Sequence, residues 1–200
     1  MNHLLNEEQF PAGFLPAWFE ARRRHALEQA EQLPEPSRHM ESWRFGAPGN
    51  ESLEHVEAAP PAALETLAPI IRERASMTEA FRIVYANGLP VSIPEELPEG
   101  LSVMDMEDFV LQCPDTARKY LETETETLGS EKLSALATAF QHNGLVIMAD
   151  REISLPLEIL HFISGDNVAV FPSTLLIAET GSRLRILERH ISADHGRQFC

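Results

Sequence analysis

A succession of short apolar segments between residues 144 and 189 limits the folds open to this chain. Turn-forming residues separate these segments, namely Asp150, Gly165-Asp166, Pro172 and Gly181-Ser182. Short β-branched and apolar runs between such separators are typical of β-strands rather than of a sheet that alternates with long helices. We therefore predict a coiled or layered β-region with strands at residues 146–148, 157–162, 168–171, 175–178 and 184–187.

The chain before this region shows helical periodicity. Pro16 suits the first turn of a helix whose apolar stripe includes Trp18, Phe19 and Ala30 and which stops at Pro34. A helix at residues 62–75 should be kinked by Pro69, and Asp105 can cap a helix that follows it. Further helices are predicted at residues 106–112, 115–122 and 133–140, the last closed by Asn143-Gly144.

A hairpin should interrupt the helices. Residues 81–85 and 89–93 flank Asn87-Gly88, a pair that supplies the positive φ angles of a type I′ turn. Pro90 and Pro94 confine the second arm to a sheet edge, because proline has no N–H to donate. A strand at residues 101–104 follows, and residues 46–61 are predicted to form a linker or exposed loop.

Length and charge restrict the classes of function. Two hundred residues suffice for one or two domains with a core. A net charge of −15 argues against a nucleic-acid partner, and we expect Arg22-Arg23-Arg24 to form a solvated helix face. No apolar run is long enough to cross a bilayer, no secretory signal is present, and two cysteines agree with a reducing compartment, so we expect a cytoplasmic protein.

Several segments, in this order, resemble the SufB/SufD family of iron–sulfur cluster assembly proteins, and its SufD branch in particular. Arg38, Glu41 and Trp43 match an Arg-x-x-Glu-x-Trp signature after the first helix, and the hairpin precedes Leu97-Pro-Glu-Gly100. The other matching segments are Leu133–Phe140, Asn143–Ile147, Ile153–Ile159 and Leu175–Glu188.

The resemblance implies a fold of mixed α and β class. An N-terminal, mainly helical region with the hairpin would occupy residues 1–141, and residues 142–200 would form the first rungs of a right-handed parallel β-helix. Independently of the resemblance, we expect Trp43 and Phe45 to pack on the first helix, because large aromatic residues usually lie in cores or interfaces. Because members of the family are about twice as long, we expect the chain to be a fragment whose open last rung self-associates. We also expect Leu176 to be buried between rungs, so that an aspartate there destabilises the fold.

The resemblance also implies a function. The chain would be a scaffold component of an iron–sulfur cluster assembly complex, would pair with a SufB-like protein and a SufC-like ATPase, and would not itself be an enzyme. The residues that serve the cluster in the family lie beyond this segment. The sequence therefore predicts no catalytic, cofactor-binding or metal-binding residue here, and the full complex would handle the iron–sulfur cluster.

The motif search agrees with a non-enzymatic role. The sequence contains no GxxxxGK[ST] or GxGxxG phosphate loop, no HExxH, no GxSxG and no CxxC. The residues most suggestive of a metal site lie at the end of the chain, where a rigid ligand set is uncommon. They are Glu188, His190, Asp194, His195 and Cys200, and we expect the chain to hold no stoichiometric iron or zinc.

Three other features have simple structural interpretations. His161, within an apolar run, is predicted to be a hydrogen-bonded histidine on a strand. Cys113 should be a small, unreactive, buried residue. The alternating acids of residues 122–127 are predicted to form a solvated loop rather than a calcium site.

Two alternatives of other classes stay open. A β-helix carbohydrate-active enzyme or acyltransferase would require paired carboxylates on adjacent rungs, or a catalytic histidine beside an aromatic cleft. The β-region offers only Phe162 and Phe171 as aromatics and no close acid pair on a strand. A non-enzymatic interaction module would differ from the scaffold in its partner.

Overall fold

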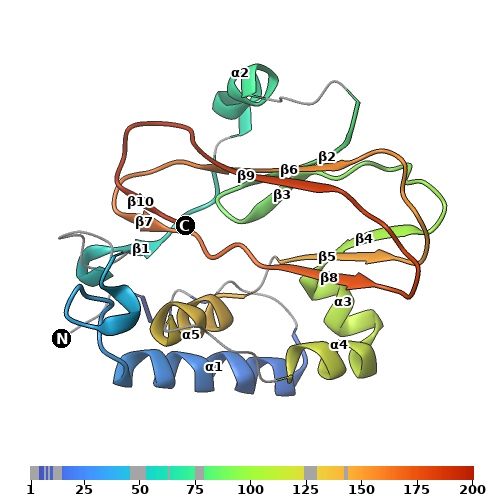
Figure 1. Cartoon of the computed structure of the whole chain (residues 1–200). Coiled ribbons are helices and arrows are strands. Elements are labelled where there is room, and N and C mark those ends of the chain that lie inside the picture. The colour runs from blue at the N-terminus through green and yellow to red at the C-terminus, as the bar shows by residue number, and fades with distance from the viewer. Residues whose placement is uncertain are drawn as a thin grey trace. The chain divides into compact units, whose positions relative to one another are not determined.

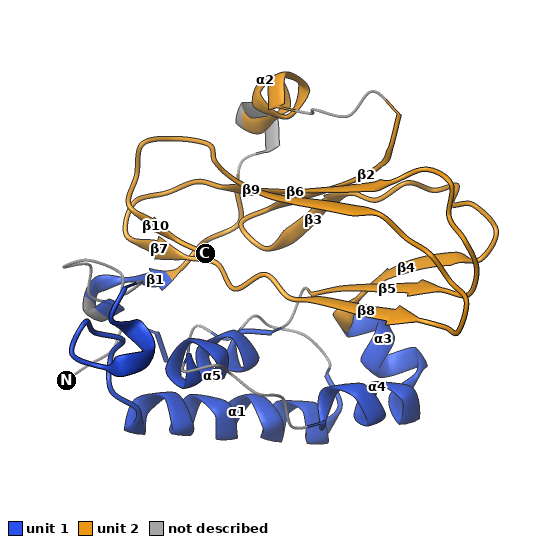
Figure 2. Cartoon of the chain, viewed as in Figure 1, with its two compact units in different colours: residues 1–57, 107–142 blue, residues 58–106, 143–200 orange. Residues whose placement is uncertain are grey.

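A computed structural model describes residues 5, 6, 8, 10, 15–45, 53–62, 64–74, 79–123, 130–141 and 144–200. The chain divides into two compact units, each assembled from two separate segments (Figure 2). Unit 1 comprises residues 1–57 and 107–142, and unit 2 comprises residues 58–106 and 143–200. Residues 58–106, which the sequence analysis assigns to the N-terminal region, therefore cluster with the strands after residue 143.

Unit 1 is helical. Helix α1 (Ala17–Gln32) lies against α5 (Glu131–Ala139), and α3 (Met106–Gln112), whose first residue belongs to unit 2, leads into α4 (Pro114–Leu121). Two short 3-10 helices, Glu41–Trp43 and Leu53–His55, complete the described elements of this unit. The buried face of α1 carries Phe19, Ala26 and Ala30, which belong to the predicted apolar stripe.

Basic side chains cap the helix ends of unit 1. Arg22 Nε donates to the carbonyl oxygen of Leu121, the last residue of α4, at 3.0 Å. Arg23 is fully buried, and its Nε donates to the carbonyl oxygen of Ala139 at the end of α5, at 2.9 Å. Conversely, Lys132 Nζ of α5 donates to the carbonyl oxygens of Ala30 and Leu33 at the end of α1, at 3.0 Å each.

These contacts correct one prediction. Arg22 and Arg23 do not belong to a solvated face, because they satisfy carbonyl groups that have no partner within their own helices. A cation at a helix C-terminus also interacts favourably with the helix dipole. Of the three arginines only Arg24 is exposed.

The aromatic residues after α1 correct a second prediction. Trp43 is half-buried, but the side chain of Phe45 is 94% exposed and does not pack on α1. The ring of Phe45 lies beneath the guanidinium of Arg44, 5.4 Å from its carbon. Phe45 therefore contacts the neighbouring Arg44 instead of being buried against α1.

Three small sheets are formed by the strands of unit 2, together with Glu57, the last residue of the first segment of unit 1 (Figure 1). Their strand orders are β3-β2-β6-β9, β4-β5-β8 and β1-β7-β10. The strands are β1 (Glu57–Ala58), β2 (Phe81–Ala86), β3 (Leu89–Ser92), β4 (Leu101–Asp105), β5 (Leu145–Ala149), β6 (Leu157–Ile163), β7 (Val168–Ala169), β8 (Thr174–Ala178), β9 (Ile186–Ser192) and β10 (Gln198–Phe199).

The strands after Gly144 pair with one another in parallel and with a nearly constant offset along the sequence. Leu145 of β5 pairs with Thr174 of β8, and Leu157 of β6 pairs with Ile186 of β9. Val168 of β7 pairs with Gln198 of β10. Strand β5 therefore pairs with β8, β6 with β9 and β7 with β10, so each partner is the third strand further along the chain. The described strands form separate sheets without closing into a barrel or a helix, so the parallel β-helix stays a prediction.

The apolar core of unit 2 lies on one face of the four-stranded sheet. Ile83 of β2 and Ile159 of β6 pack in a cluster with Leu145 and Ile147 of β5. On the opposite face, Leu160, Phe162 and other buried residues contact α2 (Leu64–Arg74), which contains the expected Pro69. Because both faces are covered, every residue of β6 is buried.

The hairpin prediction is confirmed. Strands β2 and β3 are antiparallel, and Asn87 and Gly88 between them have φ angles of 48° and 79°. Strand β3, which contains Pro90, lies at the edge of its sheet as predicted. Asn87 also accepts a hydrogen bond from the backbone N–H of Ser164 at 2.9 Å and donates to the carbonyl oxygen of Pro60 at 2.7 Å.

The expected burial of Leu176 is wrong. Leu176 pairs with the fully buried Ile147, but β8 is an edge strand, and the side chain of Leu176 is 46% exposed. Ile147 has a strand on each side, whereas Leu176 has a strand on one side only.

Among the described helices, none combines the length and the apolar character needed to span a bilayer.

Candidate functional site

The parallel register of β6 and β9 brings two histidines side by side. His161 of β6 pairs directly with His190 of β9. Because side chains alternate between the faces of a strand, Glu188 projects from the same face of β9 as His190. This face continues the one that carries the apolar core residue Ile159, the pairing partner of Glu188. Polar side chains therefore occupy positions where the neighbouring residues are apolar.

The side chains of this cluster contact one another. His161 Nε2 lies 2.8 Å from Glu188 Oε1, and the hydroxyl of Thr174 donates to the same carboxylate oxygen at 3.1 Å. The rings of His161 and His190 are stacked, with centroids 4.8 Å apart and planes 6° from parallel. Cys200 Sγ lies 3.0 Å from His190 Nδ1. We call His161, Glu188, His190 and Cys200 the β6–β9 cluster.

Burial and neighbouring charges alter the acidity of these groups. The hydrogen bond from His161 lowers the pKa of Glu188, and burial lowers the pKa of His190. Burial, together with the charge of Glu188, raises the pKa of the Cys200 thiol to about 11. At neutral pH the cluster therefore contains a carboxylate, a neutral His190 and a protonated thiol.

Two buried polar atoms of the paired strands β2 and β6 lack hydrogen-bond partners among the described residues. The side chain of His161 is only 5% exposed, and its Nδ1 has no partner. The ring of Tyr85, the pairing partner of His161 on β2, lies 5.3 Å from the His161 ring, and its hydroxyl also has no partner. Since most buried polar atoms in proteins are hydrogen-bonded, each of these two atoms has hydrogen-bonding capacity left for a further polar group.

The donor types suit a transition-metal ion. One ligand atom from each of His161, Glu188 and His190 can be chosen so that all three lie within 4.8 Å of one another. Two imidazoles and a carboxylate are known ligands of zinc and of non-haem iron. The same cluster is poorly suited to nucleophilic catalysis by Cys200, because a thiol with a raised pKa beside a histidine with a lowered pKa does not favour the thiolate.

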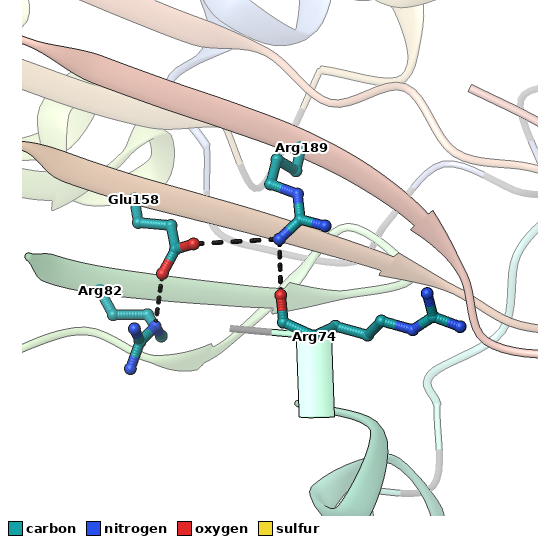
Figure 3. Close-up of polar contacts among 4 residues, drawn as sticks. All are labelled: Arg74, Arg82, Glu158 and Arg189. Carbon is teal, nitrogen blue, oxygen red and sulfur yellow. Dashed lines mark hydrogen bonds and ion pairs between the residues drawn. The ribbon is translucent and has the colours of Figure 1, made fainter. Parts of the chain in front are cut away.

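A second polar network lies on the opposite face of the same sheet (Figure 3). Glu158 is fully buried, and its carboxylate contacts Arg82 Nε at 2.7 Å and Arg189 Nη1 at 4.0 Å. Arg189 Nη1 also donates to the carbonyl oxygen of Arg74, the last residue of α2, at 2.5 Å. The network therefore links the end of α2 to the sheet through Arg189, which is a structural role.

The acids Glu158 of β6 and Glu188 of β9 do not face each other. Glu158 pairs with Leu187, so Glu158 and Glu188 project from opposite faces of the sheet. A carbohydrate-active enzyme would need two carboxylates on the same face, separated by roughly 5–9.5 Å. These two residues therefore provide no support for that alternative.

The structure brings together part of the terminal group that the sequence indicates. Glu188, His190 and Cys200 meet in the β6–β9 cluster, whereas Asp194 instead accepts hydrogen bonds from the backbone N–H groups of Gly165 and Gly196. His195 is exposed and lies outside the β6–β9 cluster. His161 is hydrogen-bonded on a strand, as predicted.

Sequence reasoning did not associate His161 with His190. These histidines have the same separation in sequence as the paired residues Leu157 and Ile186, but only the structure shows that pairing. The sequence also does not indicate Tyr85 as a neighbour of His161.

Two other predicted features lie away from the cluster. Cys113 is half-buried at the start of α4, and residues 124–127 of the alternating acidic segment lie outside the described residues.

Comparison with known proteins gives one distant relationship. No family model matches the sequence. The chain is 25% identical over 187 residues to the iron-sulfur cluster assembly protein SufD of Bacillus subtilis (strain 168). The alignment covers 88% of this chain and 42% of that protein, so the chain spans about two fifths of the length of this relative. The match supports a distant relationship to SufD.

Proposed function

We propose that this chain is a SufD-like scaffold component of an iron–sulfur cluster assembly complex. The observation that supports this most directly is the alignment with SufD, which extends over 88% of the chain. The segments that resemble the family also occur along the chain in the family's order, from Arg38 to Glu188. A scaffold of this kind acts by binding partners and is not an enzyme.

The fold of such a component would include a right-handed parallel β-helix. We propose that β5, β6 and β7 form one rung and that β8, β9 and β10 form the next. The support is the parallel pairing of all three pairs of strands at a nearly constant offset along the sequence. In a stacked solenoid each strand pairs with its equivalent in the neighbouring rung, so a constant offset is the expected pattern.

The partners would be a SufB-like protein and a SufC-like ATPase, and the complex would act in the cytoplasm. An ATPase subunit would supply nucleotide hydrolysis, since this sequence contains no GxxxxGK[ST] phosphate loop. The iron–sulfur cluster would be the cargo of the whole complex.

Co-expression tests this proposal. The chain, carrying an affinity tag, would be produced with the SufB-like and SufC-like proteins encoded in the same genome, and the eluate would be fractionated by size. We expect both proteins to co-elute with the chain and ATP hydrolysis to appear only in fractions that contain the SufC-like protein. Ile147→Asp, which disrupts the core, should abolish co-elution, whereas Glu96→Gln at an exposed position should not. Elution of the folded chain without either protein would contradict the proposal.

A further inference from the structure

The β6–β9 cluster combines features that a purely structural polar contact does not need. It places two imidazoles, a carboxylate and a thiol on one face of two paired strands, next to an apolar core. His161 is buried, and burying a polar group costs free energy unless its hydrogen-bonding atoms are satisfied. Hydrogen bonding within the cluster satisfies Nε2 of His161 but leaves its buried Nδ1 without a partner among the described residues.

We propose that His161, Glu188 and His190, with Cys200 as a fourth ligand, bind a first-row divalent transition-metal ion. The proposal concerns this chain's own residues and does not depend on the assembly function. It replaces the expectation, drawn from sequence alone, that the chain holds no stoichiometric ion.

The distances within the cluster are compatible with an ion. Ligand atoms arranged tetrahedrally around zinc at the usual bond lengths lie about 3.4–3.6 Å apart. The contact between His161 Nε2 and Glu188 Oε1 is 2.8 Å, and that between His190 Nδ1 and Cys200 Sγ is 3.0 Å. Each of these two contacts must therefore open by about half an ångström, and coordination would replace the hydrogen bonds that are lost. The ligand atoms of His161, Glu188 and His190 lie within 4.8 Å of one another, so the widest separation must instead shorten. The exposed ring of His190 must also turn out of its stack on His161, because the nitrogen lone pairs of two parallel rings do not point at one ion.

The positions of the ligands also favour binding. His161 and Glu188 lie on adjacent paired strands, which hold their backbones in a fixed register. Thr174 donates to Glu188 Oε1 and so orients the carboxylate, as groups outside the ligand shell commonly do in metal sites. Glu188 and His190 are exposed on an edge strand, which gives an ion a path into the cluster.

The donor set selects among ions. Magnesium and calcium prefer six or more oxygen ligands, and the cluster has one carboxylate. Imidazole nitrogens and a thiolate favour zinc, iron(II) and cobalt(II). Zinc therefore serves as the binding probe and cobalt(II) as the spectroscopic probe.

The experiment measures ion binding to the purified chain after treatment with a chelator. Isothermal titration calorimetry with Zn²⁺ should give a stoichiometry of about one ion per chain, and Mg²⁺ should give no binding signal. Cobalt(II) should produce the ultraviolet charge-transfer absorption of a thiolate ligand. Cys200→Ser should remove that absorption while cobalt(II) still binds.

Variants at exposed positions test the ligands without disturbing the core. We expect Glu188→Gln and His190→Gln each to weaken Zn²⁺ binding by at least about tenfold. The matched control is His195→Gln, a change at an exposed histidine outside the cluster, which should leave binding unchanged. Circular dichroism would establish that each variant is folded, and His161→Gln would serve as an additional variant at the buried ligand.

Three results would overturn the proposal. They are a stoichiometry near zero for the folded chain, Zn²⁺ binding unchanged in Glu188→Gln and His190→Gln, or an equal loss of binding in His195→Gln. Zinc binding that depends on Glu188 and His190 together with a cobalt spectrum unaffected by Cys200→Ser would exclude Cys200 as the fourth ligand. None of these measurements involves a partner protein, so their failure is distinguishable from failure of the assembly function.

Discussion

At the scale of single residues, the buried carboxylate of Glu158 should be the most sensitive polar group of the sheet. It is fully buried between Arg82 and Arg189 (Figure 3). Glu158→Ala would leave the two arginines without their anion, and breaking a buried ion pair costs about 3–5 kcal/mol. We expect a loss of that size in the free energy of unfolding, measured by urea denaturation.

The control for this prediction is Glu152→Gln. Glu152 pairs with Arg183 at 3.7 Å, but both side chains are largely exposed, and such pairs contribute about 0–1 kcal/mol. A similar loss in the two variants would indicate that burial does not determine the effect. Equal stability of Glu158→Ala and the unchanged chain would contradict the structural role of the network.

Asp194 should make stability depend on pH. Hydrogen bonds from the N–H groups of Gly165 and Gly196 lower its pKa. A carboxyl group with a lowered pKa in the folded state stabilises the fold above its ordinary pKa, and that contribution is lost as the pH falls through the folded-state value. Asp194→Asn should therefore lower the melting temperature at pH 7, and the difference from the unchanged chain should shrink below about pH 4.

Thermal denaturation at pH 7 and pH 3 would measure this effect. Glu96→Gln also removes one carboxylate charge, but at an exposed position, and it should shift the melting temperature little at either pH. A melting-temperature difference for Asp194→Asn that is the same at both pH values would show that the ionised carboxylate is not responsible.

At the scale of elements, the two turns that follow β6 and β9 lie in close contact. The N–H of Ala193 donates to the carbonyl oxygen of Ile163 at 2.7 Å, and the N–H of Arg197 donates to Asp166 Oδ1 at 2.8 Å. A Cβ atom on Gly196 would clash with the carbonyl oxygen of Gly165 and lie 3.0 Å from Asp166 Cα. Both obstacles are backbone atoms, which cannot rotate away.

Gly196→Ala should therefore destabilise the chain by about 2–3 kcal/mol, in the upper part of the usual range for single substitutions. Gly181→Ala is the comparison. Gly181 has a φ of 86° and open space around its Cβ position, so alanine there adds only the strain of a left-handed conformation, about 1 kcal/mol. Urea denaturation would measure both, and a smaller loss at Gly196 than at Gly181 would argue against close packing of the turns.

At the scale of the whole unit, the position of a strand in its sheet decides how well a residue tolerates charge. Ile147 is fully buried in the central strand β5, whereas its partner Leu176 is 46% exposed on the edge strand β8. Ile147→Asp should prevent cooperative folding, because an unpaired buried charge costs several kcal/mol. Leu176→Asp should cost about 1 kcal/mol or less, since its charge can remain in water.

Circular dichroism and thermal melting of the two variants would compare them directly. The pair is well matched, because the residues are neighbours in one register and carry side chains of similar size. Severe destabilisation by Leu176→Asp would show that something covers β8, such as a further strand or a second copy of the chain.

Local features of the sequence determined much of the secondary structure. The helix at Met106–Gln112 and the Asn87-Gly88 hairpin occur at their predicted positions, because capping and turn geometry depend on residues that are adjacent in sequence. The strand predicted at 184–187 begins too early, since β9 begins at Ile186 and continues to Ser192. Its later part, from Glu188 to Ser192, has Ile191 as its one apolar residue, so a search for apolar runs does not find it.

Tertiary structure decided which residues meet. Glu188, His190 and Cys200 are close in sequence, but His161 joins them only because β6 and β9 pair in a parallel register. Arg23 is polar in sequence yet buried, because the end of α5 provides a carbonyl group for it. Leu176 is apolar yet exposed, because its strand lies at an edge. Burial and pairing depend on contacts between distant segments, and no short stretch of sequence contains that information.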